Sequence, residues 1–271
     1  MKVNRIISIS FSQILTLSLI MLAVGAAPPK PTTSLISTIV IDAGHGGKDP
    51  GTLGSSAREK DIVLAISLEL GRRLKQHIPE AKIVYTRLND KFVELYRRAE
   101  IANENKADLF ISIHCNSTPK NMVNRQNIQG TETYVMGLHK SEENLEVAKR
   151  ENASIYQEVN YEKNYQGFDP DSPQSYILLS LSQQTYLQNS LNLARKIDFQ
   201  FRTNAKRPSR GVKQAGFVVL SKTAMPSILV ECGFLSNPAE EKFLSSTAGQ
   251  IQMAQAIFLA IKEYKKELDG N

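Results

Sequence analysis

Three side chains with metal-binding chemistry stand near the ends of apolar segments of the sequence. His45 lies in a glycine-rich stretch after the apolar run Ile39–Ile41, and His114 follows a second apolar run, Leu109–Ile113. Glu59 comes soon after the glycine-rich stretch, at the expected first turn of a helix. Two neutral imidazoles and one carboxylate leave a tetrahedral zinc ion one open position for water, as in catalytic zinc sites. A structural loop histidine and a carboxylate that favours the helix dipole are the alternatives for His45 and Glu59.

A fourth residue, Glu231, directly follows the very apolar segment Ile228–Val230. An ionised carboxylate in such a position is costly unless a metal ion, a hydrogen bond or a reacting proton compensates it. Beside a metal site, a carboxylate can accept a proton from water and hand it to a leaving nitrogen. We therefore interpret Glu231 as a candidate general base.

Alternating strand and helix patterns predict the scaffold that would bring these residues together. Apolar, β-branched runs predict strands over residues 37–41, 82–86, 109–114, 131–136, 217–220 and 227–231. Apolar residues at helical spacing predict helices over residues 61–74, 95–102 and 251–261. This alternation predicts an α/β fold: a single domain with a mostly parallel, twisted sheet covered by helices on both faces. Because the carboxyl ends of parallel strands share one edge of a sheet, His45 and His114 should meet there.

The segment over residues 138–208 differs from the rest of the chain. It is rich in Glu, Asn, Gln and Tyr, with turn residues over 167–173. We interpret it as a helical insertion within a catalytic domain that spans residues 36–268.

Composition and charge narrow the range of functions. The chain has 271 residues with 33 Lys+Arg and 27 Asp+Glu, a net charge of +6, and 41% hydrophobic residues. These values are typical of a folded protein. The positive charge is scattered and contains no Lys/Arg run, so nucleic acid is not an expected partner. Two cysteines, Cys115 and Cys232, are too few for a disulfide scaffold. We expect buried free thiols, and one disulfide between them is the alternative.

The N-terminus has the pattern of an export signal. Lys2 and Arg5 precede a mostly apolar run, Ile6–Ala27, that ends in small residues. This pattern predicts a secretory signal peptide over residues 1–26, followed by a linker over residues 27–35. An uncleaved N-terminal anchor is the alternative. The prediction places the protein in the periplasm or cell envelope, without a stable membrane span after cleavage.

Four segments together resemble a known family. They occur in the order Ile39–Gly51 (IVIDAGHGGKDPG), Arg58–Asp61 (REKD), Phe110–Asn116 (FISIHCN) and Val230–Asn237 (VECGFLSN). In this order they resemble the zinc-dependent N-acetylmuramoyl-L-alanine amidases of the amidase-3 family, which trim bacterial cell walls. The resemblance covers nearly all of residues 36–268.

The resemblance implies Zn²⁺ as the cofactor and assigns roles to individual residues. The zinc ligands of the family fall on His45, Glu59 and His114, and its catalytic glutamate falls on Glu231. Arg98 and Asn116 lie within matching segments and are candidates for binding the substrate. For Arg98, buttressing the site and a solvated helix charge are the alternatives.

The insertion is similar to that of division-associated amidases, in which a helix covers the zinc until an activator protein displaces it. The matching stretch here would be residues 172–181, with Gln174 where an acidic residue would serve as the blocking ligand. Autoinhibition is therefore a hypothesis, and a lid that shapes the substrate site is the alternative.

The implied activity is hydrolysis of the amide bond between N-acetylmuramic acid and L-alanine in peptidoglycan, for wall remodelling or separation of daughter cells. We expect a monomer whose partners are peptidoglycan and an activator protein. Two other functions fit the same residues. One is a zinc peptidase that cuts within the stem peptide, and the other is a non-catalytic or regulatory relative that only binds the wall.

Overall fold

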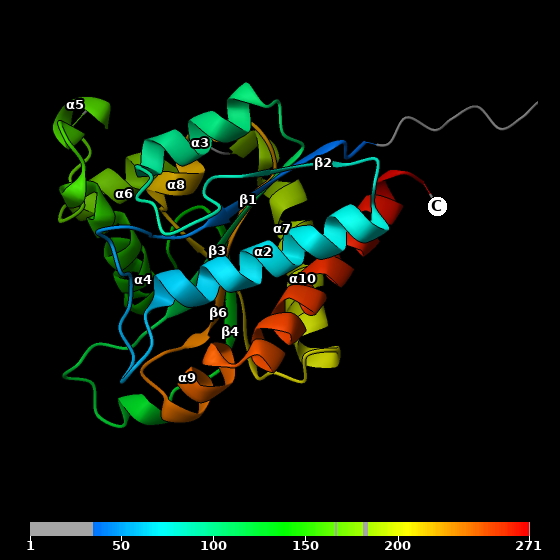
Figure 1. Ribbon diagram of the computed structural model, residues 1–271. Coiled ribbons are helices and arrows are strands. Elements are labelled where there is room, and N and C mark those ends of the chain that lie inside the picture. The colour runs from blue at the N-terminus through cyan, green and yellow to red at the C-terminus, as the bar shows by residue number, and fades with distance from the viewer. Residues whose placement is uncertain (1–34, 166, 181–183, 271) are drawn as a thin grey trace, which may run out of the picture. The chain divides into compact units, whose positions relative to one another are not determined.

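A six-stranded sheet forms the centre of the protein in a computed structural model that describes residues 35–165, 167–180 and 184–270 (Figure 1). The strand order is β2-β1-β3-β6-β4-β5. The strands are β1 (Thr38–Ala43), β2 (Lys82–Tyr85), β3 (Leu109–Asn116), β4 (Thr131–Met136), β5 (Ser209–Ala215) and β6 (Ser227–Phe234). Every neighbouring pair is parallel except β4 and β6, which are antiparallel. The predicted α/β class with a mostly parallel sheet is confirmed.

The described residues from Leu35 onward belong to one compact unit. The predicted signal peptide and all of the predicted linker except Leu35 lie outside the described residues. Within the described residues, no helix combines the length and apolarity needed to cross a membrane.

Helices cover both faces of the sheet (Figure 1). One face packs against α2 (Glu59–His77), α7 (Leu187–Thr203) and α10 (Thr247–Leu268). The other packs against α3 (Leu95–Glu104), α4 (Glu142–Asn152), α6 (Pro173–Ser180) and α8 (Val218–Ser221). The connecting segments contain η1 (Arg125–Asn127), η2 (Ala153–Gln157), α5 (Tyr161–Asn164), η3 (Gln184–Tyr186) and α9 (Pro238–Ser245).

The alternation of side chains along β1 explains this layering. Ile39 and Ile41 join the apolar cluster beneath α2, α7 and α10, whereas Val40 joins the cluster on the opposite face. All three side chains are fully buried. A strand buried on both faces reads as a continuous apolar run, which is why the sequence revealed it so clearly.

The prediction of a strand over residues 217–220 is wrong. Residues 218–221 form the short helix α8, and the neighbouring strand is β5, Ser209–Ala215. Short apolar runs suit a buried strand and a buried helix equally well, so their pattern does not separate the two. β5 escaped detection because it is an edge strand of mostly polar, partly exposed residues.

The segment between β4 and β5 is helical but does not behave as one unit. Its first part contributes α4 and α6 to one face of the sheet, whereas α7 lies on the other face and packs against α10. Because β4 and β5 are parallel, the chain needs a crossover between them. α7 therefore belongs to the scaffold, whereas α4 and α6 cover the opposite face of the sheet.

Two leucines on α2 test this layering. Leu70 is fully buried, whereas Leu68 is 38% exposed. We expect Leu70→Ala to lower the free energy of unfolding by about 2–5 kcal/mol, because it leaves a cavity in the core. Leu68→Ala should cost less than half as much. Urea denaturation followed by circular dichroism measures both values, and equal losses would contradict the packing described here.

Candidate metal centre

His45 sits directly beyond the carboxyl end of β1 in an unusual backbone conformation. Its φ of 57° lies in the left-handed region, which is uncommon for residues other than glycine. Its Nδ1 lies 2.8 Å from Asp49 Oδ2. Because a carboxylate only accepts hydrogen bonds, Nδ1–H donates to Asp49 and Nε2 is left to face the interior of the site. Nε2 is buried and has no hydrogen-bond partner among the described residues.

Two glycines allow this loop to approach the site closely. A Cβ atom at Gly44 would lie 2.4 Å from the ring of His114. A Cβ atom at Gly51 would lie 2.6 Å from Glu59 Oε2, and the φ of Gly51, +65°, is itself left-handed. The glycines of the motif therefore provide room for the metal-binding side chains.

His114 is oriented by a chain of hydrogen bonds. Ser112 Oγ lies 2.6 Å from Asp42 Oδ2 and 3.1 Å from His114 Nε2. The hydroxyl must donate to the carboxylate, so its oxygen accepts Nε2–H of the histidine. The Nδ1 atom of His114 is then directed at Glu59 Oε1, 3.1 Å away. Both histidines thus present an unprotonated nitrogen to the same point when they are neutral.

Glu59 is the first residue of α2 and is fully buried. The backbone N–H groups of Cys115 and Thr52 donate to its two oxygens at 2.8 and 2.7 Å. These bonds fix the carboxylate beside both histidines. The sequence-based interpretation placed it there correctly, although its role as a ligand stays a prediction.

A fourth ligand-type residue, Glu151 near the end of α4, completes the cluster. Glu151 Oε2 lies 3.2 Å from His45 Nε2 and 3.0 Å from His114 Nδ1. Glu59 Oε1 lies 3.1 Å from each of the same two nitrogens. Four atoms bound to a tetrahedral zinc ion at about 2.0 Å are separated by about 3.3 Å. The four side chains therefore have the spacing of a metal-binding group.

Glu151 joins the cluster but was not predicted from the sequence, which pointed to residues 172–181 as the covering stretch. Gln174 is exposed on α6, and the predicted stretch 172–181 ends at Leu181, outside the described residues. A usable signal was present, because Glu151 continues the buried stripe of Leu145 and Ala148 at a spacing of three residues. An acidic residue on the apolar face of a helix requires a compensating partner.

The charges of the cluster depend on one another. Burial alone would lower the pKa of both histidines, but the neighbouring carboxylates outweigh it. They raise the pKa of His45 well above its usual value and that of His114 to about 9. Burial opposes the charge of Glu59, but the attraction of His45 outweighs it and the pKa of Glu59 falls to about 2. Without a metal ion, protons on the histidines therefore balance the two carboxylates.

Glu231 lies next to the cluster on β6. It is the register partner of His114 across the parallel β3–β6 pair. Neither of its carboxylate oxygens has a hydrogen-bond partner among the described residues, and the nearest cation, Arg150 Nη2, is 4.0 Å away. Burial and the charge of Glu151 raise the pKa of Glu231 well above its usual value. Such a carboxyl group binds a proton more readily than an exposed glutamate does.

Arg98 and Asn116, the two candidates for substrate binding, have different positions. Arg98 is 1% exposed, forms an ion pair with Asp42 at 2.7 Å, and donates to the backbone oxygens of Ala43 and His45. This geometry favours the buttressing alternative. Asn116 lies at the end of β3 and lines a cavity beside the cluster.

Both cysteines are free and buried on the opposite side of the sheet from His114. Their neighbours belong to the apolar cluster beneath α2, α7 and α10. Burial raises the pKa of each thiol. Neither thiol belongs to the metal-binding group.

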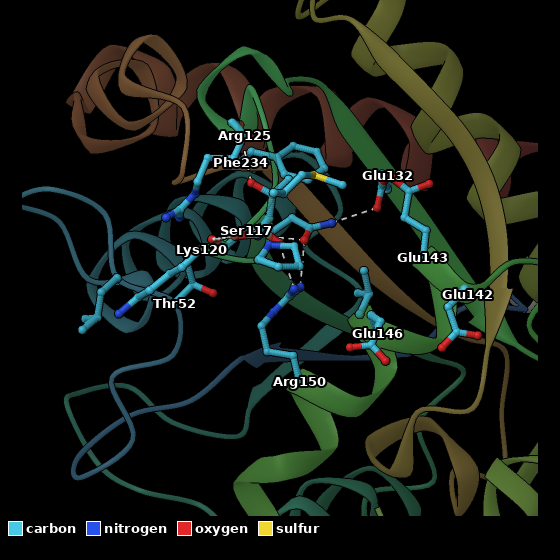
Figure 2. A pocket seen from close by; sticks show the side chains of 16 residues that line it. Thr52, Ser117, Lys120, Arg125, Glu132, Glu142, Glu143, Glu146, Arg150 and Phe234 are labelled. Atoms are coloured by element: carbon cyan, nitrogen blue, oxygen red, sulfur yellow. Dashed lines mark hydrogen bonds between the residues drawn. The ribbon is translucent and has the colours of Figure 1, made fainter. Parts of the chain in front are cut away.

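α4 closes the cluster, and a larger cavity remains beside it. The space bordered by His45, His114 and Glu151 measures only about 10 Å³, no more than one water molecule requires. The neighbouring cavity, of about 750 Å³, has acidic side chains of α4 along one side and Lys120 and Arg125 along the other (Figure 2). Arg150 lies between them, pointing from α4 toward the end of β3 (Figure 2). With α4 in this position, none of the four side chains of the cluster is more than 8% exposed.

Comparisons with known proteins identify several relatives. The family described as N-acetylmuramoyl-L-alanine amidase matches residues 39–263. The N-acetylmuramoyl-L-alanine amidase AmiA of Salmonella typhimurium is 34% identical over 240 residues, which are 88% of this chain and 79% of the relative. AmiA of Escherichia coli is 34% identical over 229 residues, 83% of this chain and 75% of the relative.

Solved structures agree with this result. The N-acetylmuramoyl-L-alanine amidase from Clostridium difficile 630 has a TM-score of 0.61 and 27% identity, covering 85% of this chain and 97% of its own. AmiC2 of Nostoc punctiforme has a TM-score of 0.58 and 31% identity, with coverages of 84% and 96%. The CwlD amidase from Clostridioides difficile, in complex with the GerS lipoprotein, has a TM-score of 0.58 and 27% identity, with coverages of 84% and 98%.

The contact between Asp49 and His45 can be tested through metal affinity. Asp49→Asn removes the carboxylate that orients the imidazole, so we expect zinc affinity to fall about 10–100-fold. Asp61→Asn, an exposed position on α2, is the matched control and should leave the affinity unchanged. Competition with a chromophoric chelator measures both constants.

The pKa of His114 also predicts how the metal-free protein responds to pH. A group whose pKa is raised on folding stabilises the protein fully below its unfolded value, 6.5, and this contribution is lost as pH rises through about 9. The metal-free protein should therefore lose stability between pH 6.5 and 9. Glu151→Gln should reduce that loss, because the Glu151 charge is the main cause that raises this pKa. Urea denaturation at both pH values, with chelator present, measures the difference, and a loss unaffected by the substitution would contradict this origin.

Proposed function

Since the chain belongs to the amidase-3 family of N-acetylmuramoyl-L-alanine amidases, we propose that it hydrolyses the amide bond between the lactyl group of N-acetylmuramic acid and L-alanine in peptidoglycan. The observation that carries this proposal is the convergence of His45 Nε2 and His114 Nδ1 on Glu59 Oε1, each at 3.1 Å, beside the carboxyl group of Glu231, which has no hydrogen-bond partner among the described residues.

The residues of the cluster suit a zinc ion. His45 Nε2 and Glu151 Oε2 are buried without hydrogen-bond partners among the described residues, which is costly unless a cation lies between them. Two nitrogens and two carboxylate oxygens at the observed spacing match the ligands and geometry that zinc prefers. His45, Glu59 and His114 would hold the ion. When bound, zinc lowers the pKa of a water molecule and polarises the scissile carbonyl.

Glu231 moves the proton in this proposal. Its carboxylate accepts a proton from the attacking water and delivers it to the nitrogen of L-alanine as the amide bond breaks. Burial raises its pKa, which favours transfer of the proton from water to this carboxylate. Arg98, paired with the Asp42 carboxylate, supports the loop by donating to the backbone oxygen of His45, and neither residue needs to contact the substrate.

We further propose that α4 holds the enzyme inactive. Glu151 occupies the position that substrate and water would need, and Arg150 forms hydrogen bonds to Asn116 Oδ1 and the Ser117 backbone at 2.7 and 2.9 Å. A protein partner that displaces α4 would open the site. The complex of the related CwlD amidase with the GerS lipoprotein supports such a partner. A lid that only shapes the substrate site is the alternative.

The proposed substrate lies outside the cytoplasm, so the protein must be exported. The N-terminal pattern over residues 1–26 supports export by a signal peptide into the periplasm or cell envelope.

The products of digestion test the proposed reaction. Because α4 covers the cluster in the intact protein, the Glu151→Ala protein serves as the parent: it is incubated with zinc and peptidoglycan, and soluble products are identified by mass spectrometry. We expect intact stem peptides with a free L-alanine amine. Glu231→Gln removes the proton acceptor and should lower kcat about 100-fold or more. Cuts within the stem peptide would favour the zinc peptidase, and binding without any product in every variant would favour a non-catalytic relative.

Substitutions in α4 test inhibition. Glu151→Ala removes the charged group that covers the cluster, so activity should rise about 10–100-fold. Lys149→Ala, at a partly exposed position on the same helix that does not line the neighbouring cavity, controls for a general loosening of α4 and should have little effect. Unchanged activity of Glu151→Ala would favour the lid that shapes the substrate site.

A further inference from the structure

A second buried glutamate, Glu132 on β4, lies beside the catalytic group and has no role in the reaction described so far. It is 2% exposed and is the register partner of Glu231 across the antiparallel β4–β6 pair. Residues directly opposite each other on antiparallel strands point to the same face of the sheet. Glu132 therefore faces the active site, although the sequence showed it only as one acidic residue in a strand of mostly apolar and hydroxyl side chains.

Glu132 is ionised and only accepts hydrogen bonds. Burial opposes its charge, but Lys213 and Arg210 outweigh this effect and lower its pKa. Lys213 Nζ and Arg210 Nε donate to its Oε1 at 2.6 and 2.7 Å. Tyr134 donates its hydroxyl hydrogen to Oε2 at 2.7 Å. The remaining contact of Oε2 is with Asn116 Nδ2 at 2.8 Å (Figure 2).

The partners of Asn116 leave only one orientation for its carboxamide. The Glu132 carboxylate cannot donate, so the group facing it must be the amide NH₂. Arg150 Nη2 and the backbone N–H of Ser117 cannot accept, and both lie 2.7 Å from the opposite atom, which must be Oδ1. The end of β3 therefore presents a hydrogen-bond acceptor, rather than a donor, to the cleft beside the metal cluster.

One of the two hydrogen bonds that Asn116 Oδ1 accepts is donated by Arg150 of α4. If α4 moves away with Glu151, Arg150 leaves as well, and one lone pair of Asn116 Oδ1 loses its donor. Asn116 is 1% exposed while Arg150 covers it, so in the open protein this oxygen needs a new donor, either water or a group of a bound ligand. A peptide N–H group of the stem peptide is the donor that the proposed substrate can supply there. The cavity of about 750 Å³ that Asn116 and Glu132 both line gives access to this oxygen.

We propose that Glu132 is a positioning residue that holds the Asn116 carboxamide with its oxygen toward the cleft, so that Asn116 accepts a peptide N–H of the stem peptide once Arg150 has withdrawn. This inference rests on the proposed amidase function and names the residue pair that recognises the peptide part of the substrate. In the closed protein, Arg150 donates to Asn116 Oδ1 at the position where a substrate N–H would donate.

Exchanging the donor and acceptor between the two positions tests the pair. Binding of a soluble muramoyl tripeptide is measured by calorimetry on the metal-free full chain carrying both Arg150→Ala and Glu151→Ala, so that neither side chain of α4 competes and no turnover occurs. Glu132→Gln lets the Asn116 amide rotate, and we expect Kd to rise about ten-fold. Asn116→Asp places two carboxylates in contact and should also weaken binding.

The double variant Glu132→Gln with Asn116→Asp is the decisive measurement. The amide introduced on β4 can donate to one oxygen of the carboxylate introduced on β3 and leave the other oxygen facing the cleft. Kd should return to within about three-fold of the parent, even though the charge of Glu132 is still missing. The double variant has the net charge of the parent, so a role limited to the direct contacts of Lys213 and Arg210 with the carboxylate at position 132 would not be rescued in this way.

Glu263→Gln is the matched control. Glu263 also accepts from a lysine and a carboxamide, Lys196 and Gln200, but it lies on α10, which packs on the opposite face of the sheet. Its Kd should equal that of the parent. Three outcomes would each overturn the inference. The parent could fail to bind the muramoyl tripeptide, or Glu132→Gln could leave Kd unchanged. The double variant could also have a Kd as high as that of the single variant that binds more weakly. Product analysis with zinc tests the amidase reaction separately, so the two proposals can fail independently.

Discussion

Four ligand atoms buried in one small volume are the constraint on which the rest of this structure depends. Two carboxylates and two imidazoles approach one another within 3.0–3.2 Å, and the remaining space is about 10 Å³. Such a group is stable only when positive charge lies among the carboxylates, either as protons on the histidines or as a metal ion. Hydrogen bonds at the edge of the sheet hold these atoms in place.

That support is built into the edge of the sheet. Asp42, at the end of β1, accepts hydrogen bonds from Ser112, Thr86 and Arg98. Through Ser112 it sets the orientation of His114, and through Arg98 it reaches the backbone of His45. One buried carboxylate thus positions both histidines, although it touches neither of them. Because Asp42 lies on the strand and not in the loop, the site inherits the rigidity of the sheet.

The parts of the site that follow from strand order were predictable, and the parts that depend on separate segments were not. His45, His114 and Glu231 were found because each follows an apolar run, and the ends of such strands share one edge of a sheet. Glu151 was missed because it arrives on a helix from another segment, whose position over the sheet no local pattern encodes. Glu132 was missed because the significance of a charged residue on a strand depends on what lies opposite it. The error over residues 217–220 has a related origin, since burial alone does not distinguish a strand from a short helix.

The carboxylate that α4 contributes also couples two equilibria. If the docked helix supplies a ligand, metal binding and helix docking must strengthen each other by the same factor, as thermodynamic linkage requires. A partner that pulls α4 away works against a larger free energy when the metal is bound than when it is absent. It also weakens the hold on the ion, because His45, Glu59 and His114 remain without Glu151. When the site opens, the ion loses the Glu151 carboxylate and another ligand takes its place. Because bound metal favours the docked helix, a higher concentration of free metal makes opening by a partner less favourable.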